Sequence, residues 1–138
     1  MRSLLTFTIA AIALASPGFA HHPFSVEFDA SQPVTLTGTV TKIEWMNPHT
    51  YFYLDVKDSS NGKVANWKLE TASPAELTRH GWKRDEVKLG DQLTVQAYRA
   101  RDGSNLANAR MITLPNGNEV FGGSAGDKGP QTATRQKR

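Results

Sequence analysis

The chain contains no cysteine, and this absence excludes several kinds of chemistry at once. Without a thiol there is no disulfide, no thiolate metal site, no cysteine nucleophile and no lipid-modified N-terminal cysteine. A strong excess of one charge is also lacking, since 16 Lys and Arg residues stand against 13 Asp and Glu residues. The 138 residues are enough for one domain. Composition therefore favours a single globular domain without covalent cross-links, but it names no reaction.

Long hydrophobic runs are scarce, and the clearest one lies at the N-terminus. Arg2 precedes the almost wholly apolar residues 4–15, and small residues end the segment at Ala20. This arrangement is typical of a secretory signal peptide, and 12 residues are too few to span a bilayer core. We expect residues 1–20 to be a signal peptide and the mature protein to be periplasmic or secreted, with no transmembrane segment. Cleavage after Ala15 is the rival, and a retained anchor is the less favoured alternative.

Charge is distributed unevenly along the chain. Residues 21–121 carry 11 basic and 12 acidic residues, whereas residues 122–138 carry four basic and one acidic residue. The second segment has no large apolar side chains, so it cannot bury enough surface to offset the entropy of ordering. We therefore expect a signal peptide at 1–20, an N-terminal segment at 21–33, a folded domain at 34–121 and a disordered basic tail at 122–138.

Alternation of apolar and polar residues predicts five strands. The clearest begins at Val34, where every second residue is apolar or glycine and the residues between are threonines. Gly38 on the inner face predicts a bend or bulge, and the slip in phase after Val40 predicts a bulge near Thr41 and Lys42. The predicted strands are residues 34–43, 50–57, 64–71, 92–99 and 106–114, with a short closing piece left open at 119–121.

One short helix is expected between the third and fourth strands. Ser73 suits the N-cap, Pro74 suits the first helical position, and Glu76 completes a capping box. Three strands, a helix and two strands are the element order of the OB-fold. We therefore predict an all-β domain with one short helix, folded as a five-stranded OB-fold-like barrel. An open sandwich with the helix packed across one end is the alternative.

Six short motifs stand out in the predicted domain: residues 21–24 (HHPF), 36–40 (LTGTV), 44–49 (EWMNPH), 81–82 (GW), 89–91 (LGD) and 98–110 (YRARDGSNLANAR). Together they resemble a family of small exported bacterial proteins of unknown function, although no single motif is specific. The resemblance implies export and a similar architecture, and it implies no activity. The expected fold is also similar to that of small periplasmic OB-fold proteins, which bind ligands or metal.

Three histidines form a candidate copper site. If cleavage frees His21, its amine and imidazole can chelate one metal ion, and His22 and His49 can add further imidazoles. Nitrogen ligands of this kind suit Cu(II), which lies at the top of the divalent affinity series. The three residues form no local motif, so the chain must fold to bring them together. In the alternative, His21 and His22 belong to a mobile terminus and His49 hydrogen-bonds a turn; we weigh the two about equally.

Met46 supports a softer variant of this site. It lies three residues before His49, and thioether plus imidazole ligands favour Cu(I). Met111 is a further candidate here, but it suits core packing equally well. We therefore treat Met46 only as a possible accessory ligand.

Outward-facing aromatic residues suggest a second function. Alternation places Tyr51 and Tyr53 on the outer face of the second strand and Lys68 on that of the third. In OB-folds this face can stack bases or sugar rings. The alternative hypothesis is therefore a metal-free binding module for a peptide, a sugar or an envelope partner. Ordinary cross-strand packing is the plainer explanation of the tyrosines.

Catalytic signatures are not found in the sequence. It has no nucleophile elbow outside the tail, no phosphate-binding glycine loop and no well-placed pair of carboxylates. We therefore expect no enzyme activity. Expected export and the near-neutral charge of residues 21–121 argue against nucleic-acid binding. A monomer is expected, whose partner is a metal ion or an unknown envelope component; an accessory role without a small ligand is the fallback.

Overall fold

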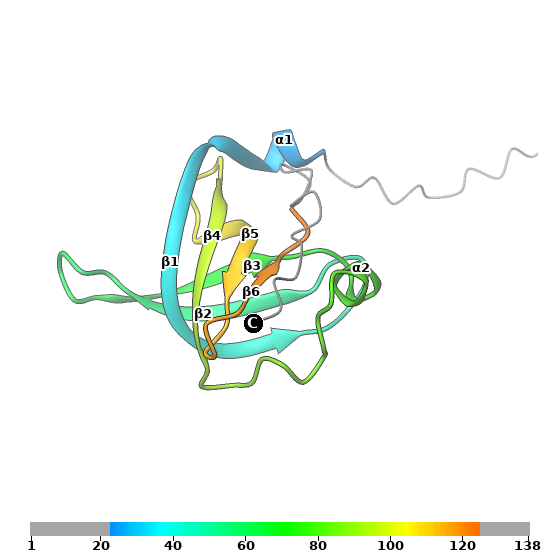
Figure 1. The fold of residues 1–138 in the computed structure, drawn as a ribbon. Helices are drawn as coiled ribbons and strands as arrows, with labels where there is room; N and C mark the ends of the chain where they lie inside the picture. Colours follow the sequence, from blue (N-terminus) through cyan, green and yellow to red (C-terminus); the bar gives the residue numbers. More distant parts are fainter. Residues whose placement is uncertain (1–22, 125–138) are drawn as a thin grey trace, which may run out of the picture.

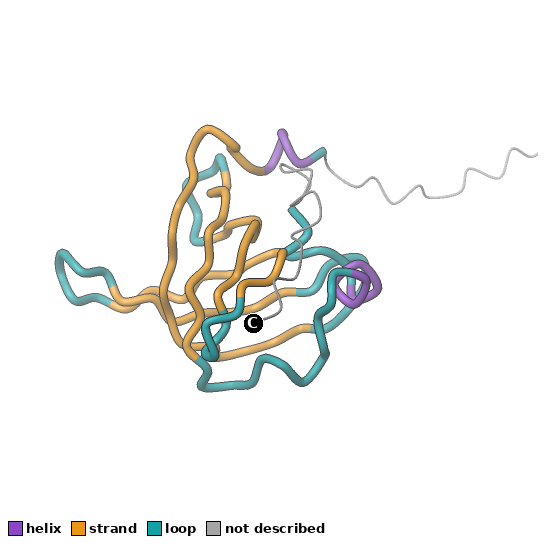
Figure 2. The backbone as a smooth tube through the Cα atoms, viewed as in Figure 1, coloured by secondary structure: helices purple, strands orange, loops and turns teal. Residues whose placement is uncertain are grey.

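A computed structural model describes residues 23–124 (Figures 1 and 2). The expected signal peptide, His21, His22 and residues 125–138 lie outside the described residues. The elements in chain order are α1 (Phe24–Glu27), β1 (Phe28–Glu44), β2 (Tyr51–Lys57), β3 (Val64–Glu70), α2 (Pro74–Arg79), β4 (Gln92–Ala100), β5 (Leu106–Thr113) and β6 (Glu119–Phe121). The predicted all-β class is therefore confirmed. No helix within residues 23–124 is long and apolar enough to cross a membrane.

Six strands form one sheet in the order β3-β2-β1-β4-β5-β6, and neighbours in this order are antiparallel. An additional parallel pairing joins β3 to β5, with Glu70 opposite Asn108. Each of the strands β1 to β4 therefore has two hydrogen-bonded neighbours, and β5 has three. Figure 1 shows how this is possible, since the long strand β1 bends from the α1 end of the molecule around to the opposite side.

The element order differs from the prediction at both ends. The short helix α1 precedes the first strand and β6 follows the fifth, so residues 23–124 contain two helices and six strands instead of one and five. The first strand begins at Phe28 and not at Val34. The prediction omitted residues 29–33 because they contain no large apolar residue and do not alternate. Their pairing is irregular, with a register shift between Phe28 and Pro33 opposite β4.

The central part of β1 follows the prediction closely. Leu36, Gly38 and Val40 are buried, and the pairing with β2 shifts register between Val40 and Lys42, so the predicted bulge is confirmed. A Cβ atom added at Gly38 would lie only 2.5 Å from the carbonyl oxygen of Asp55 in β2. Glycine is therefore required here by the close approach of two strands.

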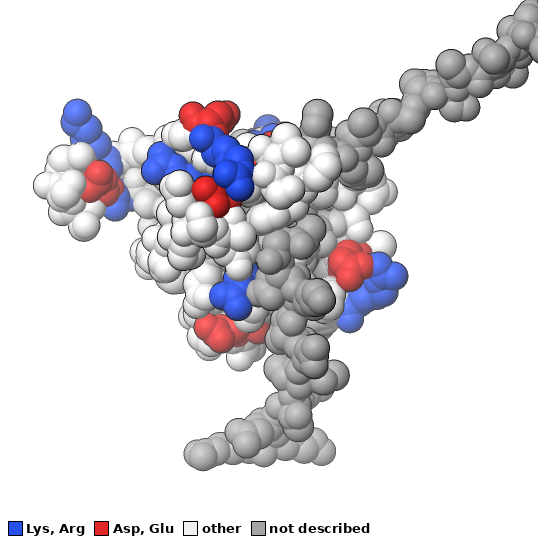
Figure 3. Space-filling model, turned by 90° about the horizontal axis from the view of Figure 1, so that it is seen from above, with Lys and Arg blue, Asp and Glu red and all other residues white. Residues whose placement is uncertain are grey.

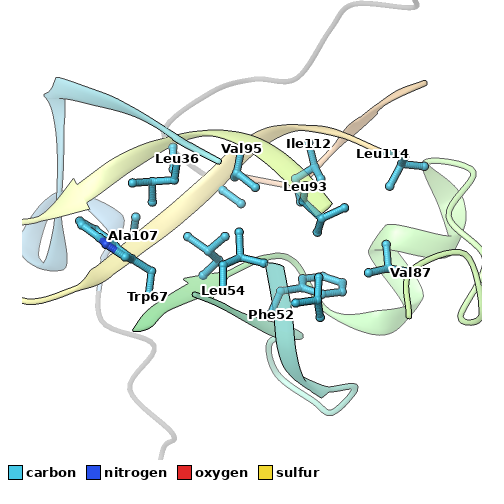
Figure 4. Packing of buried hydrophobic residues seen from close by; sticks show 14 of the residues in the cluster. Leu36, Phe52, Leu54, Trp67, Val87, Leu93, Val95, Ala107, Ile112 and Leu114 are labelled. Atoms are coloured by element: carbon cyan, nitrogen blue, oxygen red, sulfur yellow. The ribbon is translucent and has the colours of Figure 1, made fainter. Parts of the chain in front are cut away.

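The hydrophobic core lies between the strands, as Figure 4 shows for part of it, with Leu93, Val95 and Ile112 on one side and Phe52 and Leu54 on the other. The α2 region closes one end of this core. Trp82 packs on Phe52 with ring centroids 5.5 Å apart, and its Nε1 donates to the backbone oxygen of Phe121 at 3.0 Å. At the opposite end the core reaches Trp67, which is 9% exposed.

The helix α2 has the predicted start. The hydroxyl oxygen of Ser73 accepts a hydrogen bond from the backbone nitrogen of Glu76 at 3.3 Å, and Pro74 is the first helical residue. Leu77 is the buried residue that attaches this short helix to the core. The N-cap signal in the sequence therefore located the helix correctly.

Charged side chains of both signs are interspersed over the face that Figure 3 presents, with uncharged surface between the small groups. No extended patch of one sign covers that view. Recognition there would rest on short-range contacts, because mixed charges produce little long-range attraction.

Candidate functional site

His49 lies in the loop between β1 and β2, and its imidazole is fixed in one tautomer. Its Nδ1 is 3.0 Å from the backbone carbonyl oxygen of Thr71. A carbonyl oxygen only accepts hydrogen bonds, so Nδ1 donates and the neutral ring carries its lone pair on Nε2. The side chain is 33% exposed. His49 is therefore oriented so that Nε2 is the nitrogen able to bind a metal ion.

The carbonyl that orients His49 is held firmly. The backbone nitrogen of Thr71 donates to the carbonyl oxygen of Thr50 at 2.9 Å, and its hydroxyl donates to the same oxygen at 2.8 Å. In return, the backbone nitrogen of Thr50 donates to the oxygen of Ala72 at 3.0 Å. Both threonines are buried. This clamp joins the start of β2 to the end of β3 and keeps the imidazole in place.

Glu70 is a buried carboxylate beside His49. Its side chain is 12% exposed, and its Oε1 lies 3.9 Å from Nδ1 of His49. The amide nitrogen of Asn108 donates to the same oxygen at 3.1 Å. Burial raises the pKa of Glu70, and the negative charge of Glu27 acts in the same direction, whereas His49 and the Asn108 hydrogen bond oppose the rise. The carboxylate thus lies near Nδ1 of the imidazole but beyond hydrogen-bonding distance, and Nδ1 is bonded to the Thr71 oxygen instead.

Tyr51 borders this carboxylate and remains a neutral phenol. Burial, followed by the charges of Glu70 and Glu27, raises the pKa of Tyr51 to about 12. The ammonium of Lys68 lies 4.0 Å from the centroid of the Tyr51 ring. The His49 ring meets the Tyr51 ring edge-on, with 6.3 Å between centroids. We refer to His49, Tyr51, Glu70 and Asn108 as the Glu70 cluster.

Strand register explains why the cluster forms. Residues that pair across neighbouring strands point to the same face of a sheet. Tyr51 pairs with Glu70, Glu70 with Asn108 and Asn108 with Tyr98, so one outward row crosses β2, β3, β5 and β4. Phe24 of α1 packs edge-on against Tyr98, with 5.7 Å between centroids. The start of the described chain therefore lies at the end of this row.

Glu70 and Asn108 were missed by sequence reasoning. Alternation placed Glu70 on the outer face of its strand, where glutamate is ordinarily solvated. Its burial depends on the pairing of β3 with β5, which joins residues 38 apart in sequence. No local signal reveals such a contact, and only the correct topology would have found it.

The proposed ligand face is found on the outer side of β2 and β3, but its aromatic rings are already in contact with lysines. Lys68 lies over Tyr51, and the ammonium of Lys42 lies 4.9 Å from the centroid of the Tyr53 ring. The Tyr53 hydroxyl donates to Oε2 of Glu44 at 2.9 Å. A stacking ligand would have to displace these lysines.

The predicted metal ligands are only partly described. Within residues 23–124 no group of three or more His, Cys, Asp or Glu side chains is placed to hold a metal ion. His21 and His22 lie outside this range, so His49 is the predicted histidine ligand whose position is known. Met46 is half exposed in the loop of His49, and Met111 lies in β5 opposite Phe121.

The comparisons with known proteins identify a family but no activity. Residues 10–109 match the model of the family of unknown function DUF6152. No curated protein and no solved structure matches the chain. Because the family model covers well over half of the sequence, this protein belongs to DUF6152.

Proposed function

We propose that this DUF6152 protein is exported to the periplasm or the cell exterior, where it binds copper through His49, His21 and His22. It acts as a copper-binding or copper-handling protein and not as an enzyme. The observation that carries the proposal is the contact between Nδ1 of His49 and the Thr71 carbonyl oxygen. This contact leaves the lone pair of the neutral imidazole on Nε2, as metal ligation requires.

We further propose that the strands form an OB-fold-like barrel. The pairings β1–β2, β2–β3, β3–β5, β5–β4 and β4–β1 form a ring, with α2 between β3 and β4 in sequence. A five-stranded Greek-key barrel has this connectivity. His49 then lies in the loop between the first two strands, at the rim of the barrel.

The surroundings of His49 support a cation. Metal-binding histidines usually donate their other ring nitrogen to a carbonyl or a carboxylate, which fixes the ring and raises the basicity of the ligand. His49 has the Thr71 carbonyl at hydrogen-bonding distance and the Glu70 carboxylate just beyond it. Imidazole and amine nitrogens favour Cu(II) among divalent ions. In this arrangement the Thr71 carbonyl orients His49, and Glu70 adds a negative charge nearby without binding the metal itself.

The chain continuity supports His21 and His22 as partners of His49. They directly precede Pro23, and Glu27 of α1 is close enough to raise the pKa of both Tyr51 and Glu70. Two residues of extended chain span about 7 Å. Only a short length of chain therefore separates His21 and His22 from α1, which lies at the Tyr98 end of the outward row. Signal cleavage after Ala20 would add the amine of His21 to the ligand set.

The test is a Cu(II) titration of the protein matured by its own host, with the N-terminus verified by intact mass. We expect one tightly bound equivalent, weakened by about 100-fold or more in His49→Ala, since even outer-shell changes cost 10- to 100-fold. His80→Ala is the matched control, because His80 is exposed on α2 and pairs with Glu76 at 3.0 Å. Equal affinities of His49→Ala and the unaltered protein would overturn the proposal.

A further inference from the structure

A hollow of about 380 Å³ lies beside the turn between β4 and β5, and none of the residues of the Glu70 cluster lines it. We call it the Arg99 hollow; its lining residues are Asp29, Gln32, Arg99, Ala100, Arg101 and Gly103. Its volume lies within the range of pockets that hold small molecules. Because β1 begins next to the end of β4, the hollow combines residues from two distant parts of the sequence.

Arg99 reaches this hollow from the inner face of β4. Leu93, Val95 and Ala97 are the preceding inward residues of the strand, and Arg99 follows at the point where the core ends. Its guanidinium carbon lies 5.4 Å from the centroid of the Trp67 ring, so the group rests on an aromatic surface. Strand alternation therefore places the guanidinium of Arg99 at an inward position of β4, where an apolar side chain would be expected.

The charge of Arg99 has no anionic partner among residues 23–124. Its Nη2 donates to the backbone oxygen of Gly103 at 3.0 Å, which is a neutral acceptor. Its Nε is buried and has no hydrogen-bond partner within the described part of the chain. None of the ion pairs in the described part of the chain includes Arg99. A half-buried guanidinium with an unused donor is costly unless something satisfies it.

The carboxylate that lines the hollow is already engaged. Asp29 accepts hydrogen bonds from the backbone nitrogen and hydroxyl of Ser31, at 3.0 and 2.7 Å, and these bonds hold its pKa below the ordinary value. Its second oxygen lies 3.4 Å from Nη1 of Arg101. The negative charge of Asp29 therefore compensates the positive charge of Arg101. The lining of the hollow is left with one uncompensated positive charge, that of Arg99.

We propose that the Arg99 hollow binds the carboxylate of a small organic ligand. A guanidinium presents two parallel N–H groups to a carboxylate, and the aromatic ring beneath it holds the fork in place. One carboxylate cancels the single uncompensated charge, whereas a phosphate dianion would leave an excess negative charge beside Asp29. The ligand is a free organic acid or the C-terminus of a peptide, which share this group.

The test follows the Nε–Hε resonance of Arg99 by nuclear magnetic resonance in the metal-free, full-length mature protein. Acetate, succinate and inorganic phosphate are titrated at constant ionic strength. We expect saturable shifts of the Arg99 resonance with the two carboxylates and weaker binding of phosphate. The variants are compared through the backbone amide resonance of Gly103, which also lines the hollow and is present in all of them. Carboxylate affinity should fall at least tenfold in Arg99→Met, and it should be unchanged in Arg84→Met, which removes an exposed arginine from the turn after α2.

Several outcomes overturn the proposal. They are shifts that do not saturate, equal affinities of Arg99→Met and Arg84→Met, and phosphate binding as tight as carboxylate binding. Arg99→Lys keeps the positive charge but lacks the paired N–H groups of a guanidinium, so it should also bind carboxylates more weakly. This variant replaces Arg99→Met in the comparison if Arg99→Met is poorly folded. A short peptide with a free or an amidated C-terminus then distinguishes the source: preference for the free terminus indicates a peptide, and preference for succinate indicates a free acid.

Discussion

Glu70 and Arg99 are both charged side chains at the margin of one hydrophobic core, and they differ in what surrounds them. Glu70 has an amide donor from Asn108, an imidazole from His49 and a neutral phenol from Tyr51 nearby. Arg99 has a carbonyl oxygen on one nitrogen and an aromatic ring beneath it, and no group of residues 23–124 hydrogen-bonds its Nε. The charge of Glu70 is compensated inside the protein by neighbouring side chains, and the charge of Arg99 is left for a ligand of opposite sign.

Among the changes that test this comparison, we expect the largest loss of stability at Trp67. Its side chain belongs to the core, and its ring also lies against the guanidinium of Arg99. Trp67→Ala should lower the free energy of unfolding by about 3–5 kcal/mol, as removal of a large buried aromatic side chain does. Urea unfolding followed by circular dichroism measures the loss. The control Val64→Ala, at a 60% exposed position of the same strand, should change stability by less than about 0.5 kcal/mol. A loss below about 1 kcal/mol in Trp67→Ala would contradict the assignment of this residue to the core.

The next effect concerns the internal compensation of Glu70. Asn108→Leu removes the amide that donates to Oε1 of a buried carboxylate, and we expect a loss of about 1–3 kcal/mol. The matched control is Asn105→Leu, since Asn105 is exposed in the turn before β5. The same urea experiment applies to both variants. Equal stabilities of the two would show that the Asn108 amide does not support Glu70.

A smaller effect should appear as pH dependence. Because burial raises the pKa of Glu70 in the folded state, this carboxyl group is protonated more often in the folded than in the unfolded protein from about pH 4.5 up to the raised value. The contribution of Glu70 to stability is therefore greatest below pH 4.5 and declines as pH rises through this window. Glu70→Gln cannot titrate, so its stability relative to the unaltered protein should increase from pH 4 to pH 7. A constant difference across this range would argue that Glu70 is as solvated in the folded state as in the unfolded state.

The smallest effect is expected at Arg99 itself. Arg99→Met keeps an unbranched side chain over Trp67 and removes a cation whose charge is uncompensated, so the free energy of unfolding should change by less than about 0.5 kcal/mol or rise slightly. Thermal unfolding without ligand measures this change. A loss as large as that of Asn108→Leu would mean that Arg99 serves stability and would remove the contrast between the two regions.

Much of the fold was predictable because the strands are half-buried. Strict alternation around Gly38 located the first strand and its bulge, and the capping residues at Ser73 and Glu76 located α2. The prediction failed where local patterns are absent. Residues 29–33 of β1 do not alternate, and α1 has only four residues and no side-chain cap.

The candidate site was predictable only in part, since its members come from separate strands. The sequence predicted that His49 lies in a loop, where its side chain either binds a metal ion or hydrogen-bonds a turn. The structure identifies the atom that sets its tautomer, the backbone oxygen of Thr71. Glu70, Asn108 and Arg99 gave no sequence signal. Their environments depend on contacts between strands that are separated in sequence, which composition and periodicity do not encode.

The parallel pairing of β3 with β5 has a consequence for the order of folding. Contacts between segments far apart in sequence close large loops and form late, so proteins rich in them fold on a scale of milliseconds to seconds. Glu70 and Asn108, 38 residues apart, meet only when this pairing forms. A partly folded chain that has only the local hairpin of β2 and β3 would have His49 and Glu70 without the amide that holds the carboxylate. Formation of the complete Glu70 cluster therefore indicates that β5 has paired with β3.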